Sequence, residues 1–156
     1  MKVKIGLISF MALSACASNY QSVGFTGGFQ EIQLAPNIYR VTFQGNAYTN
    51  KTRASDLALL RSADITMQKG FKFFALAEAS STTNYGAIRS PTTTNFHGNT
   101  ATTTGGDVVF IQKPTNTNLV IMMNDRPEGQ FVYEASLICE SVGKKYKVTC
   151  GSAPLQ

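Results

Sequence analysis

Residues 52–69, TRASDLALLRSADITMQK, hold the clearest periodic pattern in this chain of 156 residues. At 3.6 residues per turn, its apolar side chains gather on one side of a helix and its polar side chains on the other. The expected apolar face is Leu59, Leu60, Ala63 and Met67, and the expected solvated face is Arg53, Arg61, Asp64 and Gln68. Thr52 can cap the first turn, where Asp56 suits the helix dipole, and Gly70 suits the position that ends a helix. We therefore predict a helix over Thr52–Lys69.

Apolar segments on both sides of this helix predict strands. Before it, Gln30–Leu34 and Ile38–Gln44 flank a Pro-Asn turn, and the second segment alternates apolar and polar residues as a half-buried strand does. After it, Phe71–Glu78 is almost continuously apolar, which is typical of a central strand with a helix against one face. The later expected elements are strands at Val108–Gln112 and Leu119–Met123 around a turn at 113–118, a second turn at 125–129, and a closing strand at Tyr146–Cys150.

The region after Gln130 allows two interpretations. Tyr133–Val142 fits a short helix ended by Gly143, whereas the run Phe-Val-Tyr within Gln130–Cys139 favours a strand. With strands clustered around one long helix, the sequence predicts an α+β fold, a mostly antiparallel sheet with one long helix and a short C-terminal helix packed on one face. We expect a single domain over residues 29–150.

Residues 80–106 differ in composition from the rest. Thr, Ser, Asn and Gly dominate them, so they cannot bury enough apolar area to offset the entropy of ordering. We expect either a long mobile insertion or a ragged hairpin of Thr-rich strands.

The N-terminal residues resemble a bacterial lipoprotein signal. Met1–Lys4 is basic, Ile5–Leu13 is apolar, and Leu13-Ser14-Ala15-Cys16 places small residues directly before a cysteine. The apolar run is about half the ~20 residues that a membrane-spanning helix needs. The alternatives are an uncleaved anchor helix and a plain secretory signal with an incidental cysteine. The resemblance implies a signal peptide over residues 1–15, lipidation of Cys16, and a lipidated flexible tether over residues 16–28.

The same signal also predicts the cellular location of the protein. Two or three acyl chains on Cys16 would anchor the protein firmly. Ala17 follows the cysteine where an Asp commonly retains such proteins at the inner membrane, so we expect the outer membrane, on its periplasmic side. Loss of Lys2 and Lys4 with the signal lowers the formal net charge from +5 to +3, which does not argue for binding to nucleic acid.

Two cysteines remain if Cys16 carries lipid. An oxidising exported compartment favours a disulfide between Cys139 and Cys150. The alternative is two separate buried thiols.

Residues that carry chemistry are sparse. His97 is the only histidine, the carboxylates show no acid–base spacing, and no run of ligands indicates a metal or cofactor site. We expect Asp56 and Asp64 to be solvated or paired with Arg53 and Arg61. The sequence thus predicts no catalytic residues, no metal and no cofactor. The alternative, a periplasmic small-ligand-binding domain or enzyme, needs a pocket around Arg40, Tyr48 or His97.

The order of motifs resembles the CC0125/CC1285 family of proteobacterial lipoproteins. The resemblance covers about residues 27–145 and rests on Gly28-Phe29, Tyr39–Asn46, Thr52–Ala63, Gly70–Phe74, and Arg126–Gly129 followed by Tyr133-Glu134-Ala135. It departs from the family at Phe29, where a Tyr is common, and in the pair Cys139/Cys150. It implies a non-catalytic envelope lipoprotein, favours a helix after Tyr133, and brings no catalytic residues. Such a protein can be an accessory subunit of a larger envelope assembly, held by its lipid anchor and bound to an envelope protein or to peptidoglycan.

Overall fold

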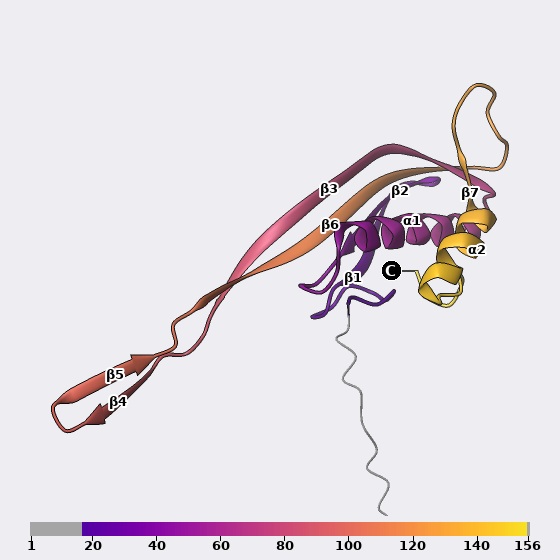
Figure 1. Ribbon diagram of the computed structural model, residues 1–156. Coiled ribbons are helices and arrows are strands. Elements are labelled where there is room, and N and C mark those ends of the chain that lie inside the picture. The colour runs from indigo at the N-terminus through magenta and orange to yellow at the C-terminus, as the bar shows by residue number, and fades with distance from the viewer. Residues whose placement is uncertain (1–16, 156) are drawn as a thin grey trace, which may run out of the picture.

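Helix α1 covers one side of a mostly antiparallel sheet and α2 packs against α1 in this computed structural model, which describes residues 17–155 (Figure 1). The main sheet has five strands in the order β1-β2-β6-β3-β7, and a separate pair is formed by β4 and β5. The predicted signal peptide and Cys16 lie outside the described residues. The elements are β1 Gly28–Ala35, β2 Ile38–Gln44, α1 Lys51–Gln68, β3 Phe73–Arg89, β4 Thr93–His97, β5 Thr100–Thr104, β6 Val108–Met123, β7 Tyr133–Glu134 and α2 Ala135–Tyr146. The predicted α+β class is confirmed.

Helix α1 begins one residue earlier than expected. The side chain of Asn50, not of Thr52, caps it, and accepts a hydrogen bond from the Arg53 N–H at 2.7 Å. Asn50 has the extended backbone that a capping residue needs. The predicted end is confirmed, because Gly70 follows Lys69 with a φ of +81° and donates to the Met67 carbonyl at 3.0 Å.

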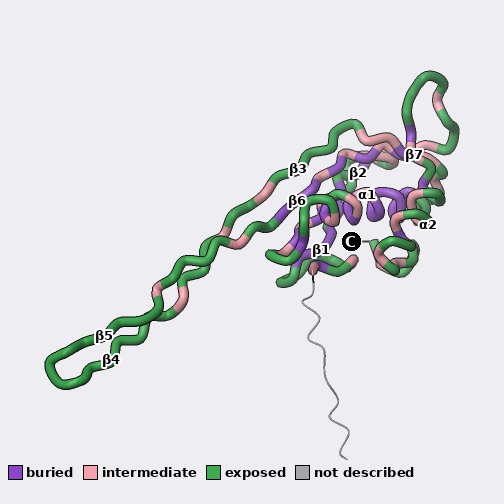
Figure 2. Tube along the Cα trace, viewed as in Figure 1, coloured by how far each residue is buried: buried purple, intermediate pink, exposed green. Residues whose placement is uncertain are grey.

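The expected division of α1 into one apolar and one solvated face is wrong. Met67 is 44 % exposed, whereas Arg61 and Asp64, expected on the solvated face, are fully buried. The sheet covers one side of α1, while α2 and the two ends of the described chain cover much of the rest (Figure 2). Two apolar clusters fill the space between these layers: Tyr39, Val41, Ala63, Ile65, Phe74, Val120, Met122 and Ala135, and then Phe29, Phe43, Ala54, Leu57, Ala58 and Leu60.

Strand β6 is continuous where a turn was expected at 113–118. It pairs with β3 along its whole length, with Val108 opposite Arg89 at one end and Met123 opposite Phe73 at the other. The strands predicted at Val108–Gln112 and Leu119–Met123 are therefore parts of one strand. Pro114 is tolerated because its missing N–H lies on the side away from β3, where its carbonyl accepts a hydrogen bond from Gly45 at 2.7 Å.

Strands β3 and β6 run far beyond the rest of the sheet. The last pairing of β2 joins Gln44 to Thr115, and residues 83–114, here called the arm, continue as a two-stranded ribbon that ends in the β4–β5 hairpin (Figure 1). Figure 2 shows the arm as almost entirely exposed. Of the two forms expected for residues 80–106, the structure has the hairpin of Thr-rich strands.

The C-terminal region contains a longer helix than expected and no closing strand. The helix predicted after Tyr133 is confirmed, but α2 passes through Gly143 and ends at Tyr146, followed by Lys147 with a φ of +56°. Val148 N–H then donates back to the Gly143 carbonyl at 2.9 Å, where a side chain at 143 would collide with the Val148 carbonyl. Since α2 includes Tyr146, the strand predicted at Tyr146–Cys150 cannot form. The predicted disulfide is confirmed: Cys139 and Cys150 are bonded, with Cα atoms 5.9 Å apart.

The segment expected to be a flexible tether is attached to the body at Ser18 and Tyr20, while residues 21–26 are exposed. Ser18 is buried, its N–H donates to the Thr49 hydroxyl at 3.0 Å, and its carbonyl accepts from Arg53. Tyr20 stacks at a tilt on Phe29, with ring centroids 4.9 Å apart. Phe25 is fully exposed. Specific hydrogen bonds thus hold a segment whose composition alone suggested a linker.

Candidate functional site

The densest group of charged side chains surrounds Arg61, which is fully buried on α1. Its guanidinium makes a bidentate pair with Glu31 on β1, through contacts of 3.2 Å and 2.6 Å, and lies 4.0 Å above the ring centroid of Phe29. It also contacts Asp64 one turn along the helix at 3.0 Å. A planar guanidinium suits this task because its donors form a fixed fork that matches carboxylates.

Asp64 is the second centre of this cluster. Besides Arg61, it accepts hydrogen bonds from the Tyr20 hydroxyl at 2.5 Å, the Gln68 amide at 2.9 Å and the Gly151 N–H at 2.6 Å. Burial and the neighbouring Asp64 charge raise the pKa of Tyr20, so its phenol keeps its proton. The carboxylate is therefore satisfied from three different parts of the chain.

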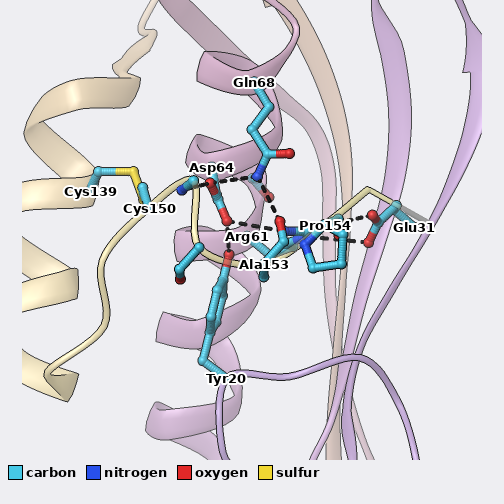
Figure 3. Close-up of polar contacts among 12 residues, drawn as sticks. Tyr20, Glu31, Arg61, Asp64, Gln68, Cys139, Cys150, Ala153 and Pro154 are labelled. Carbon is cyan, nitrogen blue, oxygen red and sulfur yellow. Dashed lines mark hydrogen bonds and ion pairs between the residues drawn. A yellow bond between two sulfur atoms is a disulfide. The ribbon is translucent and has the colours of Figure 1, made fainter.

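The same cluster holds the C-terminal segment. Arg61 donates to the carbonyls of Ala153 at 3.3 Å and Pro154 at 2.6 Å, and Gln68 also donates to Ala153 at 3.0 Å. Figure 3 shows these groups converging from both ends of the described chain, with the Cys139–Cys150 bond beside them. We call this set of Tyr20, Glu31, Arg61, Asp64, Gln68, Gly151, Ala153 and Pro154 the Arg61 cluster.

The chemistry of the Arg61 cluster is structural. All five guanidinium N–H groups of Arg61 are engaged by Glu31, Asp64, Ala153 and Pro154. Burial alone would lower the pKa of Arg61, but the hydrogen bond and charge of Glu31, together with Tyr20, raise it, so Arg61 stays charged. A catalytic acid or base needs a free position for substrate, and Asp64 and Arg61 have theirs filled by the chain itself.

The structure does not bring together the residues expected to line a ligand pocket. Arg40 lies with Glu78 beside a hollow of about 270 Å³ on the uncovered side of the sheet. Tyr48 lies in the loop before α1, beside another hollow of about 420 Å³. His97 ends β4, at the tip of the arm, and is exposed. These three residues occupy three different regions.

The expected pairing of helix carboxylates is half right. Asp64 pairs with Arg61, but Asp56 pairs with Lys145 of α2 at 2.7 Å instead of with Arg53, and also accepts from the Tyr146 hydroxyl at 2.7 Å. Sequence reasoning missed the burial of Arg61 and the role of Glu31. A signal was present, since Glu31 follows Phe29 by two residues in a strand and therefore shares its buried face.

Within residues 17–155, no three His, Cys, Asp or Glu side chains are grouped so as to hold a metal ion. Across the same residues, no helix is long and apolar enough to cross a membrane.

The arm is the other unusual feature, because it exposes apolar side chains on both faces. Residues paired across the ribbon share a face, so Tyr85, Ala87, Val108 and Phe110 lie on the side of α1, and Ile88, Val109 and Ile111 lie on the opposite side. Phe110 is 73 % exposed, Tyr85 68 % and Val109 59 %. Strands that are apolar on both faces are typical of sheets covered on both sides. Here no element of the described chain covers them.

No protein-family profile, no curated protein and no solved structure matches this chain.

Proposed function

We propose that this protein is a lipid-anchored, non-catalytic component of the cell envelope, held at the periplasmic side of the outer membrane, that binds another protein through its arm. The observation that carries the proposal is the exposure of apolar residues along residues 83–114. An isolated two-stranded ribbon is at best marginally stable in water, and large exposed apolar patches are a mark of interaction surfaces.

The anchor belongs to the proposal through the sequence of residues 1–16, and so does the resemblance to the CC0125/CC1285 lipoproteins. The packing of Ser18 adds a geometric consequence. Two residues span at most about 7 Å, so lipid on Cys16 would keep the body next to the membrane surface. The body would act as the base, and the arm would reach away from the anchoring point toward a partner.

The absence of a free functional group in the Arg61 cluster supports a binding role over catalysis. Its carboxylates and guanidinium are occupied by the protein's own groups, and the expected pocket residues lie far apart in the fold. A binding protein needs a rigid base and an exposed contact surface, and this architecture supplies both.

Photo-cross-linking in intact cells tests the binding role. A photoreactive residue replaces Tyr85 or Phe110 on the arm, and Glu140 on the exposed side of α2 serves as the matched control. We expect protein adducts from the two arm positions and few from position 140. Equal labelling at the three positions, or no adduct at either arm position, would remove the proposal.

The anchor is tested separately. We expect globomycin, which blocks the lipoprotein signal peptidase, to cause accumulation of the unprocessed chain, and we expect Cys16→Ser to release the protein from the membrane fraction. A Cys16→Ser chain that matures normally, together with no effect of the drug, would contradict the lipoprotein assignment.

A further inference from the structure

The outer edge of β6 has no partner strand along the arm. Strand β2 stops at Gln44, opposite Thr115, and no other strand of residues 17–155 pairs with this edge. The carbonyls of Pro114 and Met122 point toward the β2 side, where they accept from Gly45 and Asn37. Alternate residues of a strand point the same way, so the backbone N–H and C=O groups of Val108, Phe110 and Gln112 all face this open edge.

We propose that this edge pairs antiparallel with the same edge of a second copy of the chain, on a two-fold axis at Phe110. The inference rests on the proposed binding function and names its partner. In this register Phe110 faces Phe110, and Val108 faces Gln112 of the second copy in both directions. All three outward residues then meet outward residues. Moving the two-fold axis to residue 111 would pair Val108 with Pro114, which has no N–H. Moving it to residue 109 would pair Gln112 with Gly106, which lies outside the strand.

Charge fixes the same register. The arm contains only three charged residues, Arg89, Asp107 and Lys113. With Phe110 on the axis, Asp107 of each copy lies opposite Lys113 of the other, which gives two attractive cross-strand pairs. No like charges face each other across the paired edges. A neutral partner strand would leave Asp107 and Lys113 without this match.

The ends of the paired region leave room for the second copy. In the dimer, the chain before Asp107 would run into the end of β2 of the second copy, which occupies the same edge from Thr115 onward. The chain must therefore turn away before Asp107. It does so at Gly105 and Gly106, whose φ values are +96° and +86°, and Figure 1 shows the tip as a separate hairpin beyond this break. At the base of the arm, Tyr48, Phe110 and Gln112 border the hollow of about 420 Å³. Val108 of the second copy would enter this hollow beside Gln112.

In the proposed dimer, both copies can be anchored in the same membrane. Residues opposite each other in an antiparallel pair project to the same face, so both copies of α1 would lie on one side of the joined sheet. Ser18 is bonded to Thr49 and Arg53 at the start of α1. Both chains would therefore approach Cys16 from that same side.

Disulfide trapping in membranes of cells that express the full chain tests the geometry. In the Phe110→Cys variant, position 110 supplies the only added thiol, and its Cα would lie about 5.5 Å from that of the second copy, within disulfide range. Ala87→Cys is the matched control, because Ala87 is the exposed residue paired with Phe110 on β3. Its two copies would lie about 15 Å apart, three strand spacings, and cannot bond. We expect oxidation to give a homodimer from Phe110→Cys and monomer from Ala87→Cys.

Charge reversal tests the register. We expect Asp107→Lys or Lys113→Asp alone to weaken dimerisation of the detergent-solubilised protein by about tenfold, since each turns two attractive pairs into two repulsive ones. The double variant Asp107→Lys/Lys113→Asp should restore it. Sedimentation of the three variants beside the unaltered chain provides the measurement.

Three outcomes would overturn the inference. They are equal homodimer from Ala87→Cys and Phe110→Cys, no rescue by the double charge reversal, and disulfide or photo-adducts at position 110 that contain only a different protein. The last outcome would leave the proposed binding function intact, while a lack of any adduct along the arm would remove both.

Discussion

Strands β3 and β6 belong to two regions of this molecule, and the two regions differ in what covers them. In the body, Phe74, Val120 and Met122 are fully buried beneath α1. In the arm, the same two strands carry Tyr85 and Phe110 in the open. The strands are continuous through both regions, so strand formation does not require that each segment have its own core. The difference teaches that the body is stabilised by its own packing, while no element of residues 17–155 covers the arm.

The largest expected effect comes from removing the buried charge of Arg61. Arg61→Met would leave the carboxylates of Glu31 and Asp64 buried without their guanidinium, at a cost of about 3–5 kcal/mol in the free energy of unfolding. It would also remove the hydrogen bonds from Arg61 to the carbonyls of Ala153 and Pro154. Urea denaturation followed by circular dichroism measures the change.

The matched control lies in the arm. Arg89→Met makes the same chemical change at an exposed position, and we expect it to shift the free energy of unfolding by less than about 0.5 kcal/mol. Similar losses from the two variants would mean that the arm contributes to stability as the body does, and the contrast between the regions would fail.

The burial of Arg61 was not predicted from the sequence, which placed this residue on a solvated helix face. The 3.6-residue period located α1 to within a residue at each end, because Gly70 and the polar residues before the helix are local signals. It could not show that Arg61 and Asp64 are buried, since their cover comes from Tyr20 and Ala153, which are distant in sequence. Likewise, Lys113-Pro114-Thr115 has the composition of a turn, but long-range pairing with β3 makes it strand.

The second largest effect concerns the Cys139–Cys150 bond. Closing a loop with a sequence separation of 11 should contribute about 3 kcal/mol in the chain-entropy model, so the double variant Cys139→Ser/Cys150→Ser should unfold at a correspondingly lower urea concentration. Loss of the bond would also free the segment that brings Gly151 and Ala153 to the Arg61 cluster. Hydrogen exchange should therefore increase at residues 148–155 and stay unchanged in the arm. Faster exchange in the arm would contradict the independence of the two regions.

A smaller effect appears at high pH through Tyr20. The fold raises the pKa of Tyr20 above its ordinary value of 10.0, so the unfolded chain loses this proton first as the pH rises. The contribution is fully present below pH 10 and declines above it, by about 1.4 kcal/mol at pH 11. The free energy of unfolding, measured from pH 8 to 11, should thus fall more steeply for the unaltered chain than for Tyr20→Phe.

Tyr146→Phe is the comparison for that experiment. Tyr146 also has a raised pKa, through partial burial and its hydrogen bond to Asp56, but it lies nearer the surface. Tyr146→Phe should therefore reduce the loss of unfolding free energy at high pH by less than Tyr20→Phe does. The reverse order would show that the N-terminal segment is not held on the body as Tyr20 and Ser18 indicate.

A small effect is also expected from removing the tip of the arm. Residues 91–106 can be replaced by Asn-Gly, which forms the two-residue turn that suits a hairpin, because Ser90 and Asp107 already face each other through a backbone hydrogen bond of 2.9 Å. The removed residues bury no part of either apolar cluster, so the free energy of unfolding of the monomeric body should change by less than about 1 kcal/mol, the scale of the altered loop closure. A loss comparable to that of Arg61→Met would show that the tip supports the body. An unchanged body would show that residues 91–106 are not needed for the stability of the body, in contrast to the buried cluster around Arg61.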